Sequence, residues 1–284
     1  MRSSNPVFSR RGFSRDSGGY AGFNAQQQPQ AGNPYATSPS AQQNPYAQQP
    51  QTAGQPYATP PAAPPQAGRM TMDDVVARTG MTVGLVVVMA AVAWITDMSL
   101  GLAIGAALIA MVLSLVQAFK RKPVPALILA YAAFEGLFLG ALSNFVDGYV
   151  NGAAMQAVLG TMAVFTAVLV MYKTRIIRVT QRFYRFVMAA AIGFVLLMGI
   201  NLLFAVFGGG DGLGFRSGGM GILFGVIGIL LGACFLALDF KQVEDGIAYG
   251  APKEESWMAA FGLTLTLVWI YLEFLRLISI LQGD

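Results

Sequence analysis

The chain has 284 residues, of which 55% are hydrophobic and only 11% are charged, against about 25% charged in a typical soluble domain. It has no histidine, which excludes histidine-based metal sites, Ser-His-Asp triads and Cys-His dyads. Its single cysteine, Cys234, excludes an intrachain disulfide. We therefore expect neither an enzyme nor a protein with a resident cofactor.

Residues 1–69 differ in composition from the rest of the chain. They are rich in Gln, Pro, Ala, Gly, Ser and Tyr, with hardly an aliphatic residue. Such a segment cannot bury enough apolar surface to fold, so we predict a disordered cytoplasmic tail over 1–69 and a membrane domain over 70–284. The repeats "NPYA" at 33–36 and 44–47 and "QPYA" at 55–58 fit a tail that recruits protein partners, or a solubilising tether grown by duplication.

An all-α membrane protein with seven transmembrane helices is predicted for the remainder. Thr71 with Asp74 three residues later is a typical N-terminal helix cap. Apolar runs long enough to cross a bilayer follow. They cover residues 79–96, 99–119, 124–146, 150–172, 186–207, 219–240 and 257–281.

The basic residues predict the orientation of these spans. Of the 18 Lys and Arg residues, 16 lie in the tail or in the second, fourth and sixth loops. We expect these segments in the cytoplasm, with the protein in the plasma membrane and the C-terminus outside. The fourth loop is the most basic, and beside a membrane it is expected to contact anionic lipid headgroups and not nucleic acid. Its basic residues are Lys173, Arg175, Arg178, Arg182 and Arg185.

Four charged residues fall inside the predicted spans, where each costs at least about 2.5–3.5 kcal/mol to insert. Glu273 and Arg276, at i,i+3 in the seventh span, can form a structural salt bridge. Alternatively, Glu273 faces a polar interior near Asp239 or Glu135. Two carboxylates in a dry site cannot both ionise cheaply, so such a pair takes up a proton near physiological pH and binds calcium transiently when ionised.

The other two carboxylates each have an alternative interpretation. Asp239 ends the sixth span, where a carboxylate is often simply solvated. Glu135 can anchor a helix–helix contact, because Gly136 and Gly140 allow close backbone approach. Asp239 and Glu273 are also predicted at different depths, and they can meet only if the sixth helix continues through "KQVEDGIAY" and the seventh begins below the membrane surface.

Three motifs resemble the Bax inhibitor-1 family, in particular its bacterial members with a long N-terminal extension. They are "FEG" at 134–136, "ALDFKQVEDG" at 237–246 and "YLEFLRLISIL" at 271–281, and the resemblance covers roughly 72–283. It implies seven helices with the last packed centrally, and a pH-sensitive calcium leak channel controlled by an aspartate pair between helices six and seven. By motif, that pair corresponds to Asp239 and Glu273, so the second position is Glu here. Arg276 stands where the family more often has an apolar or amide residue.

Two functional hypotheses follow. The leading one is a proton-modulated cation leak, with Glu273 as a titratable ligand and Arg276 tuning it. The alternative is a non-conducting membrane scaffold that recruits partners through its tail or basic loops. The scaffold hypothesis predicts that Glu273 and Arg276 pair only with each other, and that neutralising both together has no effect.

Overall fold

The computed structural model describes residues 68–208, 214–215 and 217–283. All of them belong to one unit of the chain, residues 61–284. The tail predicted over 1–69, with its "NPYA" and "QPYA" repeats, lies outside the described residues except for Gly68 and Arg69. Its disorder therefore stays a prediction.

Seven helices within the described residues are long and apolar enough to cross a membrane, which confirms the predicted all-α membrane fold. A 3-10 turn, η2, at Lys253–Glu255, precedes the last of them. The helices are α1 Met72–Ile95, α2 Leu100–Phe119, α3 Pro125–Asp147, α4 Ala153–Lys173, α5 Gln181–Gly208, α6 Gly218–Ala248 and α7 Ser256–Gln282.

The helix ends extend beyond the predicted spans where polar residues continue the helix. The predicted cap of α1 is present: the Asp74 amide donates to Thr71 Oγ1 at 3.2 Å, and the Thr71 amide donates to Asp74 Oδ2 at 3.3 Å. Helix α6 continues through Lys241 and Asp245, which form an ion pair at 2.7 Å one turn apart. Apolar runs report only the part of a helix that suits hydrocarbon, whereas backbone hydrogen bonds continue into the polar ends.

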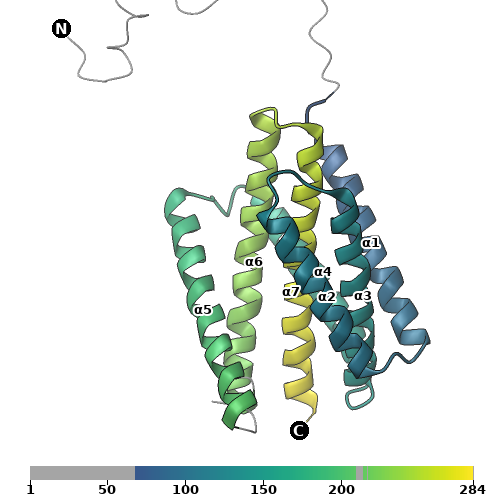
Figure 1. Ribbon diagram of the computed structural model, residues 1–284. Coiled ribbons are helices and arrows are strands. Elements are labelled where there is room, and N and C mark those ends of the chain that lie inside the picture. The colour runs from purple at the N-terminus through teal and green to yellow at the C-terminus, as the bar shows by residue number, and fades with distance from the viewer. Residues whose placement is uncertain (1–67, 209–213, 216, 284) are drawn as a thin grey trace, which may run out of the picture. The chain divides into compact units, whose positions relative to one another are not determined.

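Helix α7 lies among α1, α3, α4 and α6, so the expected central position of the last helix is confirmed (Figure 1). Polar side chains tie it to its neighbours: Thr264 hydrogen-bonds Thr82 of α1 at 2.8 Å, and Tyr271 hydrogen-bonds Ser143 of α3 at 2.6 Å. Helix α2 packs on α3, and α5 packs mainly on α6 at one side of the bundle (Figure 1). These two peripheral helices pack little against α7. The surface of α7 is therefore less covered on the sides of α2 and α5 than where α1, α3, α4 and α6 contact it.

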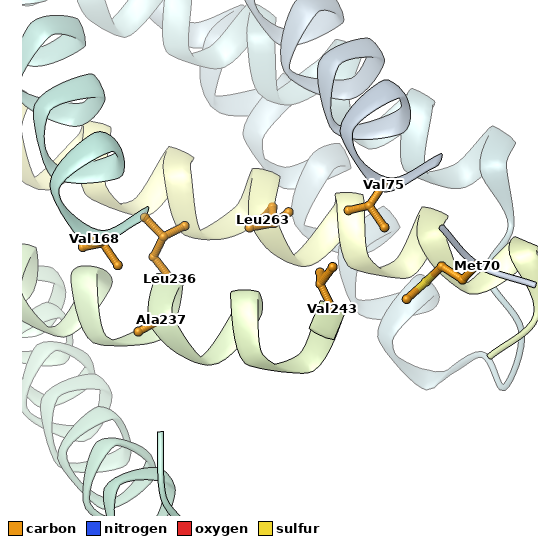
Figure 2. Packing of buried hydrophobic residues seen from close by; sticks show 7 residues of the cluster. All are labelled: Met70, Val75, Val168, Leu236, Ala237, Val243 and Leu263. Atoms are coloured by element: carbon orange, nitrogen blue, oxygen red, sulfur yellow. The ribbon is translucent and has the colours of Figure 1, made fainter. Parts of the chain in front are cut away.

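A buried apolar cluster joins four helices near the N-terminal end of α1 (Figure 2). It includes Met70, which precedes α1 and is only 4% exposed. The members are Met70, Val75, Val168, Leu236, Ala237, Val243 and Leu263. Because residues of both α6 and α7 are packed here, this cluster helps to fix the register between the two helices.

The close contact expected at Gly136 and Gly140 is present, between α3 and α1. A β-carbon at Gly136 would stand 2.4 Å from the Val86 carbonyl oxygen, and one at Gly140 would stand 2.1 Å from the Ala90 carbonyl oxygen. No side chain fits at either position without moving a backbone, so these glycines allow the two helices to touch.

Candidate functional site

Glu273 and Arg276 form a buried ion pair on α7. Their side chains are 9% and 12% exposed, and Arg276 Nη2 donates to Glu273 Oε2. The salt bridge that the i,i+3 spacing allows is therefore present. Arg276 Nε and Nη1 are also buried, yet neither has a hydrogen-bond partner among the described residues. A guanidinium carries five N–H donors, so the hydrogen bond to Glu273 satisfies only part of the donors of Arg276.

Helix α6 makes room for the ion pair with glycine. A β-carbon at Gly228 would stand 2.8 Å from the Glu273 carboxyl carbon. Gly232, one turn along α6, is equally tight against Ile270, whose Cγ1 would be 2.6 Å away. At these two glycines α6 is thus too close to α7 for a side chain, and the Glu273 carboxyl lies directly against the α6 backbone.

Asp239 is not brought together with Glu273. Its Oδ2 accepts a hydrogen bond of 2.6 Å from Thr266, and its Oδ1 would be 3.6 Å from a β-carbon at Gly262. Helices α6 and α7 run antiparallel, and Gly228 is the residue opposite Glu273. Asp239 is 11 residues further along α6, roughly 16 Å at 1.5 Å per residue. As a contact between the two carboxylates would require, α6 continues to Ala248 and α7 begins at Ser256. The register between the two helices nevertheless keeps Asp239 and Glu273 apart.

Two clefts lie along α7. The α5 cleft, of about 670 Å³, separates α5 from α7. It is lined by Phe194, Val195, Met198, Gly199, Asn201, Leu202, Ala205, Ser217, Trp269, Leu272 and Glu273. The α2 cleft, of about 310 Å³, lies between α2, α3 and α7. It is lined by Ala107, Met111, Ser114, Tyr131, Glu135, Phe138, Leu265, Val268, Trp269 and Leu272. Trp269 and Leu272 line both clefts, so these two side chains form the partition between them.

Among the described residues, each cleft is lined by one carboxylate. Glu273 lines the α5 cleft, and Glu135 lines the α2 cleft. Glu135 is half-buried and has no hydrogen-bond or ion-pair partner in the described part of the chain. Glu135 takes no part in the contact that Gly136 and Gly140 make with α1. It lines the cleft between α2, α3 and α7 instead. The described residues contain no group of three or more Cys, Asp or Glu that could hold a metal ion.

Trp269 is held in place from two sides. Its Nε1 donates to the Gly228 carbonyl oxygen at 3.1 Å, and its ring packs against Phe194 of α5 with centroids 5.7 Å apart. The residue that separates the clefts is therefore hydrogen-bonded to the same glycine that accommodates the Glu273 carboxyl.

The basic residues of the fourth loop lie where α4 ends and α5 begins. Lys173, Arg175, Arg178, Arg182 and Arg185 are all exposed. Ile176 and Phe186, in the same segment, are 70% and 71% exposed. Exposed cations beside exposed apolar side chains suit the boundary between water and a bilayer.

Sequence reasoning missed Gly228, Trp269 and Thr266. A signal for the first was present: "GVIGILLG" at 225–232 repeats glycine every three or four residues, which is typical of close helix packing in membranes. Trp269 and Thr266 stand one and two turns before Glu273, but without the register of α6 nothing indicated which groups they contact.

Comparison with known proteins supports the resemblance. A family model described as "Bax inhibitor 1 like" matches residues 5–283. The match begins well before residue 72, where the motif-based resemblance started, and so includes most of the tail. No curated protein matches the sequence.

Proposed function

Because this chain belongs to the Bax inhibitor 1 like family, we propose that it is a pH-sensitive leak pathway for cations, and for calcium above all. The observation that carries the proposal is the pair of clefts along α7, each with one carboxylate and separated by Trp269 and Leu272. Carboxylates inside a membrane domain are costly and typically mark ion pathways. Calcium suits them because it accepts carboxylate and carbonyl oxygens in flexible geometry.

In this proposal the ion passes beside α7, from Glu135 to Glu273 or in reverse. The partition of Trp269 and Leu272 closes the route, and its displacement joins the two clefts. Asp239 has a separate role, because it faces Thr266 and lines neither cleft. The gating carboxylate is thus Glu273 with Arg276 as its partner, and no longer an Asp239–Glu273 pair.

The pH sensitivity is assigned to the Glu273–Arg276 ion pair. Among the residues that the structure describes, Glu273 is the ionisable one in the lining of the α5 cleft; α5 contributes the uncharged Asn201 there, and α6 presents Gly228. Protonation as the pH falls removes the charge of Glu273 and ends its attraction for the Arg276 guanidinium. Arg276, already short of hydrogen-bond acceptors, is then free to move, and the closed arrangement is lost.

Calcium flux into proteoliposomes between about pH 5 and pH 8 tests this proposal. Flux should rise as the pH falls. Glu273→Gln should give a raised, pH-insensitive flux, whereas Glu135→Gln should lower flux at every pH because a cation-attracting group is lost. Asp239→Asn is the matched control and should retain the parent's pH response. Equal, pH-independent flux in all four proteins would exclude the channel.

One observation favours the second candidate, a non-conducting scaffold. Glu273 and Arg276 lie in the bundle interior and pair with each other, which is one part of what that hypothesis expects. It predicts background flux for the parent and for a Glu273→Gln/Arg276→Gln double variant.

For the topology we propose a cytoplasmic N-terminus, an external C-terminus and residence in the plasma membrane. Support comes from the exposed basic residues of the fourth loop, at the same end of the bundle as the start of α1. Labelling of introduced cysteines with a membrane-impermeant reagent, in intact cells and in opened cells, tests it. The cysteines are introduced by Arg175→Cys and by Gly283→Cys in a Cys234→Ser background. Labelling of position 175 from outside would reverse the assignment.

A further inference from the structure

The α5 cleft has the dimensions of a lipid tail. Its α5 wall extends from Phe194 to Ala205, which is about 16 Å along a helix. One leaflet contributes half of a hydrocarbon core of about 30 Å, or roughly 15 Å. The cleft thus spans the depth of a single leaflet, alongside the C-terminal half of α5.

The volume of the cleft is sufficient for an acyl chain. Carbon atoms in contact are about 4 Å apart, so 16 Å of an acyl chain needs on the order of 200 Å³, and the cleft holds about 670 Å³. The cleft therefore accepts at least one extended acyl chain.

The lining and the surroundings also suit an acyl chain. Most of the lining is apolar, with Val195, Met198 and Leu202 on α5 opposite Leu272 on α7. Its polar members are Asn201, Ser217, Trp269 and Glu273, four of the eleven lining residues that the structure describes. Helix α5 is one of the seven membrane-crossing helices, so hydrocarbon surrounds its outer face.

We propose that the α5 cleft is a lipid-binding site, in which an acyl chain of a membrane phospholipid lies between α5 and α7 against Trp269 and Leu272. The chain covers the cleft side of the Glu273 carboxyl and fills the space that α5 leaves beside α7. This proposal does not depend on ion conduction, since it concerns what occupies the cleft in the resting protein.

Quenching of Trp269 by brominated lipid tests the proposal. The full chain carrying Trp94→Phe and Trp257→Phe keeps Trp269 as its one tryptophan, and it is reconstituted into vesicles of phosphatidylcholine with or without brominated acyl chains. Trp269 is half-buried and lines both clefts, so a chain within a cleft brings bromine closer to it than a chain outside the bundle does. We expect quenching comparable to that of a protein that keeps only Trp94, which is 36% exposed on α1.

Two glycines of α5 provide matched variants. Gly199 lines the cleft and Gly193 does not, and a β-carbon at either position meets nothing within 4 Å. Gly199→Leu should narrow the cleft and reduce the quenching of Trp269 at least twofold, whereas Gly193→Leu should leave it unchanged. Ala205→Leu, on the same wall, replaces Gly199→Leu if that variant fails to fold.

A third variant identifies the route of entry. Ala107→Leu narrows the α2 cleft, which also reaches Trp269, and should leave quenching unchanged. Unquenched Trp269, equal quenching with Gly199→Leu, or loss of quenching only with Ala107→Leu would each overturn the proposal. Mass spectrometry in mild detergent gives a second readout: the parent and Gly193→Leu should retain one phospholipid that Gly199→Leu loses.

Discussion

Gly228 of α6 lies so close to Glu273 of α7 that a β-carbon at position 228 would stand 2.8 Å from the carboxyl carbon and 2.9 Å from Oε2. The same glycine accepts the Trp269 indole hydrogen bond through its carbonyl oxygen. One residue without a side chain therefore sets the position of both the ionisable group and the partition between the clefts. Changes in α6 packing at this point must act on the site directly.

Gly228→Ala should destabilise the protein. An exposed Gly→Ala change in a helix normally stabilises by about 0.5–1 kcal/mol, but forcing a methyl group into a filled contact costs about 1–3 kcal/mol. We expect a lower thermal midpoint in detergent and, if ions pass, a changed pH response of flux.

Gly193→Ala is the matched control for that prediction, because its β-carbon meets nothing within 4 Å. It should leave the thermal midpoint unchanged or raise it. An equal loss of stability in both variants would mean that the contact with Glu273 is not the cause.

The sequence predicted the architecture well because the membrane imposes strong rules on it. A span needs about 20 apolar residues, and α1 to α7 each contain such a run. The cap at Thr71 was equally readable, since its two residues are only three apart in the chain. Local patterns and chain length were sufficient for both.

The site was harder to predict because it depends on the register between two helices. Asp239 and Glu273 each appeared as a costly charge within a span, but whether they meet is decided by the glycine contact at Gly228 and by the cluster around Leu236 and Leu263. A shift of α6 by three turns would bring the carboxylates together without changing any local pattern. No pattern in the amino-acid sequence alone distinguishes these registers.

Arg276→Gln should be strongly destabilising. It removes the guanidinium that pairs with Glu273, and breaking a buried ion pair typically costs about 3–5 kcal/mol. The double variant Glu273→Gln/Arg276→Gln should recover part of this loss because no charge remains. Unfolding of the four proteins in detergent forms a double-mutant cycle, and we expect a coupling of at least about 1 kcal/mol. Additive effects would show that the pair contributes nothing beyond its two members.

Trp269→Leu should raise cation flux if the protein conducts. It removes the indole that separates the clefts and its hydrogen bond to Gly228, while keeping an apolar side chain. Flux into proteoliposomes at about pH 7 should rise several-fold. Trp94→Leu, at a lipid-facing position of α1, is the control and should behave as the parent. A folded Trp269→Leu protein with unchanged flux would place the closed point elsewhere.

Arg78 should be a principal support for the start of α7. Its Nη1 donates to the Lys253 carbonyl oxygen at 2.6 Å and to Ser256 Oγ, and its guanidinium lies 5.1 Å from the Trp257 ring centroid. Arg78→Ala removes these contacts from η2 and from the first turn of α7, at a cost of about 2 kcal/mol. Arg78→Lys should recover little, because an ammonium cannot reproduce a planar fork stacked on an aromatic ring.

Lys253→Ala distinguishes the contribution of Arg78 from that of the neighbouring Lys253–Asp74 ion pair. Its Nζ lies 3.0 Å from Asp74 Oδ1, but the lysine side chain is 53% exposed, so the pair is screened by water. We expect Lys253→Ala to leave the unfolding midpoint nearly unchanged. Hydrogen exchange of the amides at 251–257 should increase in Arg78→Ala and remain at the parent rate in Lys253→Ala. Equal exchange in the two variants would mean that the backbone contact of Met70 with Ala251, at 2.8 Å, holds this junction without Arg78.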